Sequence, residues 1–228
     1  MRMANYRIVA GLAILLAVAG CDFSIDGDSD SPTKVNGSVH IPAGKPRGEA
    51  RTVNGSIHID DNAAVTSATT VNGSIHLGSH ATADSLKTVN GSLTLGTGAR
   101  VSENAGSVNG DLSLADGAEV SGHLGNVNGK IGLTAAHVAG GIKTVSGNIN
   151  ILGASRVEGG ITVEKPTGIM FSSGDPVIII GPGATVTGDL RFERKVKLYV
   201  SDKATIGNVI GATPVMFSGD TPPKSSGD

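Results

Sequence analysis

The stretch that decides the fold is Thr52-Val53-Asn54-Gly55-Ser56-Ile57-His58-Ile59, because close copies of it recur at nearly constant spacing through more than half of the chain. Val-Asn-Gly begins at six places, and Val145-Ser146-Gly147 takes a seventh. The successive steps are 18, 18, 18, 19, 19 and 18 residues. A repeat of this length is typical of a solenoid. The six copies begin at Val35, Val53, Val71, Val89, Val108 and Val127.

A shorter period of six residues lies inside the longer one, with aliphatic or small residues at every sixth position from Val53 to Val101. Apolar Ile57 and Ile59 flank a polar residue, which is strand alternation, whereas a helix would space them by three or four residues. Six residues cover a short strand and a corner, so three such units close one turn, stacked on the next at about 4.8 Å. The pattern predicts an all-β fold: a single-stranded parallel β-helix of about ten coils, with 18–19 residues per coil.

The Asn-Gly pair is interpreted as a corner of each coil. Glycine readily adopts positive φ, and asparagine tolerates the left-handed region better than most residues. Asn-Gly also favours hairpins, but the apolar rows keep their register across it, which favours a corner in a coil. Asparagines stacked one per coil are expected to form a hydrogen-bonded ladder with a structural role. The row is Asn36, Asn54, Asn72, Asn90, Asn109 and Asn128.

Residues 1–20 have the layout of a secretory signal peptide. Two arginines precede an apolar run over 8–19, which is short for a bilayer span, and small residues precede Cys21. Val18-Ala19-Gly20-Cys21 resembles a bacterial lipoprotein signal. That resemblance implies cleavage before Cys21 and lipidation of this residue, which is the only cysteine. We therefore expect a lipid-anchored membrane protein of the bacterial cell envelope, facing the periplasm.

The segments on either side of the repeats lack the period. Residues 21–33 are expected to comprise the lipidated cysteine and an acidic flexible tether. The polar tail over 218–228 is expected to be disordered. The β-helix domain is expected over 34–217. Removal of residues 1–20 takes away two arginines and no acidic residue, so the formal net charge changes from −2 to −4. This acidity argues against a nucleic-acid partner.

Several places inside 34–217 depart from the regular repeat. Arg47 falls where an aliphatic residue is expected, with prolines nearby, which favours an end cap on the first coil. One-residue insertions near Gly106 and Gly125 are expected to be absorbed at corners. Residues 164–176 interrupt the period and predict a loop, after which the six-residue row resumes. With 39% hydrophobic and 3% aromatic residues, the core must be narrow and aliphatic.

Three later segments carry a resemblance to a known family. They read Gly-Ala-Arg-Val-Ser over 98–102, Gly-Ala-Glu-Val-Ser-Gly-His-Leu over 117–124 and Gly-Ala-Thr-Val-Thr-Gly-Asp-Leu over 183–190. They are similar to the coils of bactofilins, polymer-forming bacterial proteins with a β-helical core, and the resemblance covers roughly residues 34–210. It implies a structural protein that self-assembles. The usual bactofilin lacks the lipoprotein signal and the Asn-Gly corners found here, which argues against a cytoplasmic cytoskeletal role.

An enzymatic function is not expected. The six-residue row also resembles the hexapeptide-repeat acyltransferases, which would need a catalytic base such as His123 or His137 near a subunit cleft. A polysaccharide lyase would need acidic and basic residues grouped on one face. The two histidines occupy non-equivalent repeat positions, and the acidic residues are scattered over the coils. Both histidines are interpreted as solvated corner residues, and no catalytic residue and no cofactor are expected.

Three histidines form the most regular candidate site. His40, His58 and His76 each follow the asparagine of their repeat by four residues and lie between two inward aliphatic residues. They should stack on one outer face about 4.8 Å apart, close enough to share a metal ion such as zinc. Other polar residues occupy the same place in later coils. The preferred interpretation is therefore a position that accepts any polar β-former, with no metal.

Two further rows are expected at the surface. A hydroxyl row gives weak support to an ice- or glycan-binding face, and a basic run is interpreted as a charged guard on terminal strands, with docking of acidic lipid or polysaccharide as the alternative. The hydroxyl row is Thr52, Thr70, Thr88, Ser107 and Thr144, and the basic run is Arg191, Arg194, Lys195 and Lys197.

The sequence thus predicts a structural or interaction protein with the membrane, a second copy of itself, and an envelope polysaccharide or protein as its partners. Assembly through the ends of the solenoid is the leading mechanism, because an open end exposes backbone donors and acceptors. Val196, Leu198 and Val200 are expected to form the pairing surface. The alternative is an adhesin-like binding module that uses one flat face, and a hexapeptide-type acyltransferase or polysaccharide-active enzyme comes third.

Overall fold

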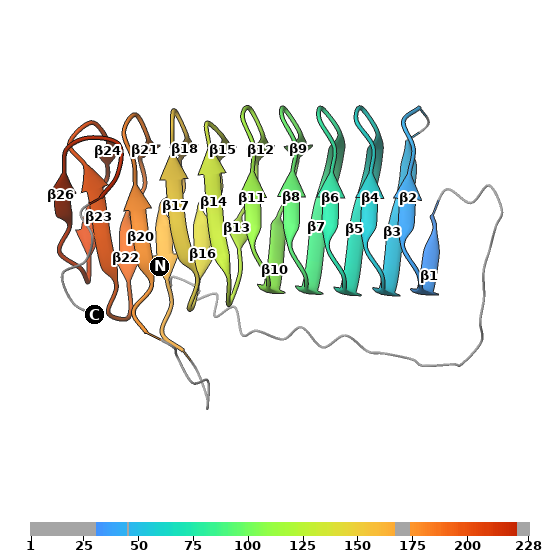
Figure 1. Ribbon diagram of the computed structural model, residues 1–228, viewed down its shortest axis with the longest axis horizontal. Helices are drawn as coiled ribbons and strands as arrows, with labels where there is room; N and C mark the ends of the chain where they lie inside the picture. The colour runs from blue at the N-terminus through green and yellow to red at the C-terminus, as the bar shows by residue number, and fades with distance from the viewer. Residues whose placement is uncertain (1–30, 45, 167–173, 223–228) are drawn as a thin grey trace, which may run out of the picture.

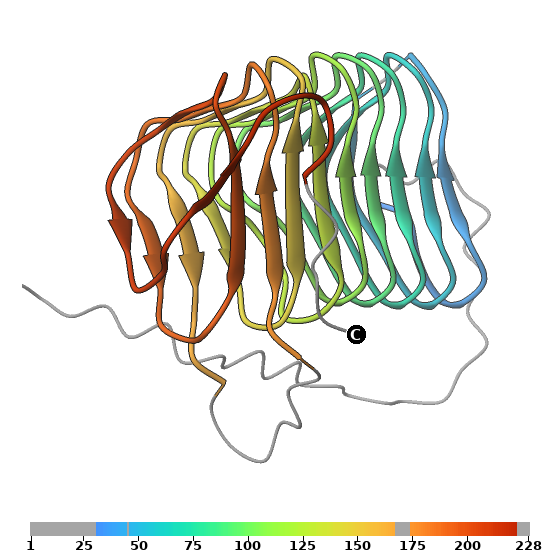
Figure 2. The same cartoon turned by 60° about the vertical axis from the view of Figure 1, so that its left-hand side comes forward.

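The computed structural model describes residues 31–44, 46–166 and 174–222. These residues wind into a parallel β-solenoid with two hydrogen-bonded sheets, one of 16 strands and one of 10, running along its long axis (Figure 1). The successive coils lie on one another in register (Figure 2). No helix occurs among the described residues. The fold class predicted from the repeats is therefore confirmed.

The ten-stranded sheet receives one strand from each coil, and all of its pairs are parallel. Ile57 pairs with Ile75, and Ile75 pairs with Leu93, so the 18-residue step is the register of the sheet. Isoleucine and leucine point inward and are fully buried, and the residue between them points outward. The strands are β2 (Val39–Ile41), β4 (Ile57–Ile59), β6 (Ile75–Leu77), β8 (Leu93–Leu95), β11 (Leu112–Leu114), β14 (Lys130–Thr134), β17 (Asn148–Leu152), β20 (Val177–Ile180), β23 (Lys197–Ser201) and β26 (Val215–Phe217).

The sixteen-stranded sheet changes character along the chain. Its N-terminal coils contribute one long strand each, and later coils contribute two short ones. The long strands follow the short β1 (Thr33–Asn36) and are β3 (Arg47–Asn54), β5 (Ala64–Asn72) and β7 (Thr82–Asn90). The short strands are β9 (Arg100–Val101), β10 (Ala105–Asn109), β12 (Glu119–Val120), β13 (Leu124–Gly125), β15 (His137–Val138), β16 (Ile142–Thr144), β18 (Arg156–Val157), β19 (Ile161–Val163), β21 (Thr185–Val186), β22 (Leu190–Phe192), β24 (Thr205–Ile206) and β25 (Val209–Ile210).

A one-residue insertion explains this change. Ala83 pairs with Val101, which is 18 residues further on, but Leu86 pairs with Ala105, which is 19 residues further on. The extra residue therefore lies between Val101 and Ala105, just before Gly106, where the insertion was predicted. It divides the long strand, and both β9 and β10 consequently pair with β7.

The glycine of the repeat is required by the stacking of the coils. Gly55, Gly73 and Gly91 have φ values outside the left-handed region, so the interpretation based on positive φ is wrong for these corners. A Cβ atom on Gly73 would lie 2.0 Å from the carbonyl oxygen of Gly55. Only a residue without Cβ allows the backbones of successive coils to approach so closely. Gly37 and Gly129 of the same row do have positive φ, 110° and 115°, so the interpretation holds at these two corners. At a different corner of the coils, Asn62 and His80 are left-handed, with φ of 60° and 56°.

The inward position next to this corner belongs to the hydroxyl row. Thr52, Thr70, Thr88, Ser107 and Thr144 are all buried. Thr70 Oγ1 donates a 2.9 Å hydrogen bond to Gly55 O, and Thr88 Oγ1 donates one of 2.9 Å to Gly73 O. Because neighbouring strand residues alternate, the valines that follow face outward: Val71 and Val89 are half-buried. The six-residue aliphatic row is therefore interrupted at the valines of this corner, and the surface position expected for the hydroxyl row is wrong.

The C-terminal end also differs from its prediction. Leu198 and Val200 are each 1% exposed and lie in the core, and Val196 packs against that core. One more strand, β26, pairs outside β23, with Val200 opposite Met216. The expected pairing surface of Val196, Leu198 and Val200 is therefore covered by the chain itself. The exposed large apolar residues of the last coil are Ile210, Val215 and Met216, at 41%, 49% and 57%.

Several predicted segments lie outside the described residues. These are the signal peptide over 1–20, the lipidation site Cys21, most of the tether over 21–33, residues 167–173 of the predicted loop and residues 223–228 of the tail. The described residues contain no helix long and apolar enough to cross a membrane.

Candidate functional site

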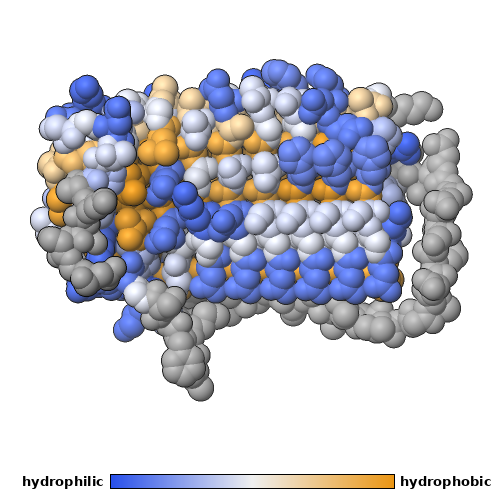
Figure 3. All heavy atoms as spheres, in the orientation of Figure 1, coloured by the Kyte–Doolittle hydropathy of each residue, from blue (hydrophilic) through white to orange (hydrophobic). Residues whose placement is uncertain are grey.

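The asparagine row forms a continuous ladder along one exposed corner. Five hydrogen bonds of 2.9–3.1 Å connect the six side chains, each Nδ2 donating to the Oδ1 of the preceding coil. A serine row runs beside it, in which Ser56 N and Ser74 N each donate to the Oγ of the serine one coil before at 3.2 Å. Parallel polar rows are visible on this side of the molecule in Figure 3. The amide groups of the asparagine row thus satisfy one another from coil to coil.

The middle outward position of the ten-stranded sheet defines a second row, here called the outer row. It contains His40, His58, His76, Thr94, Ser113, Gly132, Asn150, Ile179, Tyr199 and Val215, each paired with the next. The row is histidine-rich at its N-terminal end, small and polar in the middle, and apolar at its C-terminal end. One face of the solenoid therefore offers three different chemistries.

The three histidines of the outer row stack as the sequence pattern predicts. The ring centroids of His58 and His76 are 4.9 Å apart with nearly parallel planes, and those of His40 and His58 are 5.8 Å apart. His40 Nε2 lies 2.8 Å from Asp60 Oδ1, and His58 Nε2 lies 3.4 Å from the same oxygen. Within the described ranges, no group of three or more His, Cys, Asp or Glu side chains is placed to hold a metal ion. The arrangement is a hydrogen-bonded imidazole–carboxylate group.

A row of charged side chains lies on the short strands of the other sheet. Arg100 forms an ion pair with Glu119, and Arg156 Nε donates a 2.9 Å hydrogen bond to Glu158 Oε1. His137 lies between the carboxylates, with Nδ1 3.8 Å from Glu119 Oε1 and Nε2 3.3 Å from Glu158 Oε1. Hydrogen bonding to Arg156, and then to His137, holds the pKa of Glu158 below its usual value. The row is therefore a connected group of basic and acidic side chains.

Sequence reasoning missed this charged row. It treated the acidic residues as scattered and His137 as a solvated corner residue, whereas His137 lies on β15 in register with Glu119 and Arg156. A signal was present, because four members of the row directly precede an inward valine: Arg100, Glu119, His137 and Arg156. His123, by contrast, lies exposed between β12 and β13, where its backbone N–H donates a 2.7 Å hydrogen bond to Asn104 Oδ1.

Arg194 of the basic run has a structural role. One coil is longer than the others at the Asn-Gly corner, and Ile161 consequently pairs with Leu190, 29 residues on. Arg194 reaches across this corner: its Nη1 donates to Val145 O and to Ser146 Oγ, each at 3.1 Å, and its Nη2 donates to Gly174 O at 2.9 Å. This guanidinium therefore connects the coils on either side of the longer one.

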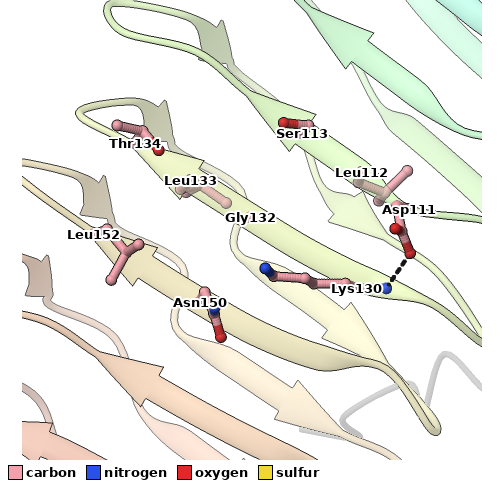
Figure 4. Close-up of a pocket in the computed structure, with 9 residues that line it drawn as sticks. All are labelled: Asp111, Leu112, Ser113, Lys130, Gly132, Leu133, Thr134, Asn150 and Leu152. Carbon is pink, nitrogen blue, oxygen red and sulfur yellow. Dashed lines mark hydrogen bonds between the residues drawn. The ribbon is translucent and has the colours of Figure 1, made fainter. Parts of the chain in front are cut away.

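A hollow of about 270 Å³ opens on the outer face of β11, β14 and β17 (Figure 4). Lys130 and Asp111 lie at one end, where Lys130 N donates a 2.7 Å hydrogen bond to Asp111 Oδ1. Gly132 forms part of the lining, and its place in the outer row carries no side chain. Polar groups and one exposed apolar side chain complete the wall, which also contains Leu112, Ser113, Leu133, Thr134, Asn150 and Leu152.

Fold and surfaces together define a parallel β-solenoid of stacked 18–19-residue coils with ladder-like faces. No protein-family model, curated protein or solved structure matches the chain.

Proposed function

We propose that this protein is a lipid-anchored structural or interaction protein of the bacterial cell envelope that self-associates through the C-terminal end of its β-solenoid. The observation that carries the proposal is the exposed apolar edge of the last coil, formed by Ile210, Val215 and Met216. Among the described residues, no strand pairs with the outer edges of β24, β25 and β26. An apolar strand edge of this kind is a template for pairing with another chain.

The N-terminal end of the solenoid is proposed to lie near the membrane and to take no part in self-association. Arg47 takes the place of Val65 in the register of β3 and β5, and within the described part of the chain β1 pairs with β3 alone. This coil follows the proposed tether, so it would lie near the membrane, and the apolar C-terminal coil would lie away from it. Contact between two C-terminal ends closes a dimer, whereas a head-to-tail contact propagates. The resemblance to bactofilins adds support for self-assembly, and a closed end-to-end contact is the form we propose.

Met216→Lys is expected to abolish self-association. A lysine on the outer edge of β26 would place a charge in an apolar contact, and its side chain replaces one that is 57% exposed, so the coils remain folded. Analytical ultracentrifugation of residues 22–228 over a range of concentrations tests this. The wild-type chain should form a larger species as concentration rises, and the variant should stay monomeric.

Leu152→Lys provides the control for that experiment, because it puts the same charge on an exposed apolar residue of the lateral face. It should associate like the wild-type chain. A wild-type chain that is monomeric at every accessible concentration contradicts the proposal, and equal loss of association in both lysine variants would place the contact elsewhere.

Cys21→Ala is expected to eliminate membrane attachment. The proposed anchor is covalent lipid on this residue, and two or more acyl chains hold a protein stably on a bilayer. Metabolic labelling with a fatty-acid analogue, followed by separation of membrane and soluble fractions, measures the effect. Ser24→Ala, three residues away, should keep both label and membrane attachment. A wild-type protein without lipid label rejects the anchor.

A further inference from the structure

Gly132, in the middle of the outer row, is a glycine at a position where the fold does not require one. Histidine, threonine, serine and asparagine occupy this row in other coils, but Gly132 occupies it in β14. A Cβ atom on Gly132 would have Leu112 O, at 4.0 Å, as its nearest neighbour, and the φ of Gly132 lies outside the left-handed region. Asn-Gly corner glycines that stack on a preceding coil differ, since a Cβ there would collide with backbone, as at Gly55, Gly73 and Gly91. Neither close packing nor backbone conformation therefore explains Gly132.

The missing side chain creates the hollow on this face. Figure 4 shows Gly132 between Ser113 on one neighbouring strand and Asn150 on the other, with Lys130 and Thr134 on the same strand. The wall contains hydroxyl, amide, ammonium and carboxylate groups, which together donate and accept hydrogen bonds. Lys130 and Asp111 contribute one charge of each sign, so the hollow has no net charge. It therefore suits a neutral ligand with several hydroxyl groups.

An apolar strip continues from the hollow toward the C-terminal coils. Leu152, on the wall of the hollow, is 37% exposed. Asn150 pairs with Ile179, and Ile179 pairs with Tyr199, so these half-buried side chains stand in line on the same face. The coil spacing places Tyr199 about 14 Å from Gly132 along the axis, three spacings of about 4.8 Å. An aromatic ring and branched aliphatic side chains offer a surface for the C–H face of a ligand.

We propose that this surface, from the hollow at Gly132 to Tyr199, binds a neutral linear polysaccharide along the solenoid axis. One sugar unit enters the hollow and exchanges hydrogen bonds with Ser113, Thr134 and Asn150. The following units run over Leu152 and Ile179, and a ring stacks on Tyr199. This inference specifies the ligand of the flat-face binding module and does not depend on association through the C-terminal end.

Tyrosine fluorescence gives a direct test. The sequence has two tyrosines and no tryptophan, so a chain of residues 22–228 contains Tyr199 as its only fluorescent residue of these types. Titration with cellotetraose and with tetra-N-acetylchitotetraose, two neutral β-1,4-linked probes, should produce a saturable change in this signal with at least one of them. Saturation-transfer NMR on the same probes provides a second readout that does not rely on Tyr199.

Gly132→Thr is the decisive variant, because it fills the hollow with a residue that the same row already carries at Thr94. It should weaken binding by about tenfold or more, equivalent to about 1.4 kcal/mol, while the thermal midpoint stays that of the wild type. Tyr199→Ala should reduce the NMR signal in the same way. His58→Thr changes the same row four coils away and should bind normally, as should the association variant Met216→Lys.

The proposal is overturned if neither probe changes the fluorescence or the NMR signal of the wild-type chain. It is also overturned if Gly132→Thr binds as well as the wild type, or if His58→Thr loses binding to the same degree as Gly132→Thr. Because Met216→Lys tests association and Gly132→Thr tests the hollow, failure of one proposal is distinguishable from failure of the other.

Discussion

Gly73→Ala is expected to destabilise the protein by about 3 kcal/mol or more, at or above the upper end of the usual cost of overpacking. The added Cβ would lie 2.0 Å from Gly55 O and 2.5 Å from Gly55 C, and both atoms belong to the backbone of the preceding coil. Relief requires the two coils to separate at this corner. That separation would stretch the hydrogen bond from Gly55 N to Asn72 O, now 3.0 Å, and would disturb the asparagine ladder. Thermal unfolding followed by circular dichroism measures the loss.

Gly132→Ala is the matched control, since it adds the same methyl group to another strand glycine where the nearest atom is 4.0 Å away. Its stability should stay within about 0.5 kcal/mol of the wild type. If Gly73→Ala and Gly132→Ala unfold at the same temperature, the close approach of successive coils is not the reason for glycine at the Asn-Gly corners.

Leu93→Asp is expected to prevent folding or to leave only a partly folded chain. Leu93 is fully buried on β8, between Ile75 and Leu112 in register, so a carboxylate there would face an aliphatic column. Burying an unpaired charged or polar group costs several kcal/mol, which is a large part of the stability of a typical domain. Loss of the β-type circular dichroism spectrum, or a sharply lower urea midpoint, is the expected reading.

Thr94→Asp places the same carboxylate on the next residue, which faces outward. It should fold with a spectrum like that of the wild type, because the charge stays in water. If the two variants behave alike, then the assignment of inward and outward residues on this strand is wrong.

The comparison of Thr70 with Val71 shows where sequence reasoning succeeds and where it fails. The pair Ile75 and Leu77 could be placed inside with their polar neighbour outside, because both members of the alternation agree with hydrophobicity. At the strand end, strand alternation and hydrophobicity predict different inward residues. Threonine faces inward because its hydroxyl finds Gly55 O at 2.9 Å, and that acceptor comes from the preceding coil. Hydrophobicity alone predicts that the valine faces the core, so the structure was needed to show that the threonine does.

Longer-range features were harder to predict for a different reason. Glu119 and His137 are neighbours only when 18- and 19-residue steps are both counted correctly, and the insertion near Val101 obscures that count. Gly132 could not be singled out from the sequence, because glycine is common throughout the repeats. Its significance depends on the free space around a Cβ atom, which no sequence pattern contains. Leu198 was placed at the end of the solenoid because the strand that covers it, β26, is short and follows an irregular connection.

The asparagine ladder has a consequence for the length of the molecule. Each rung contacts only the equivalent residue one unit before and one unit after it, and the units beginning at Val53 and Val71 have the same length. A unit added or lost in this region would therefore restore the same bonds and change the rod by about 4.8 Å. Length can thus vary by gene duplication while the faces keep their chemistry, so the distance between the two ends of the solenoid can evolve separately from what either end binds.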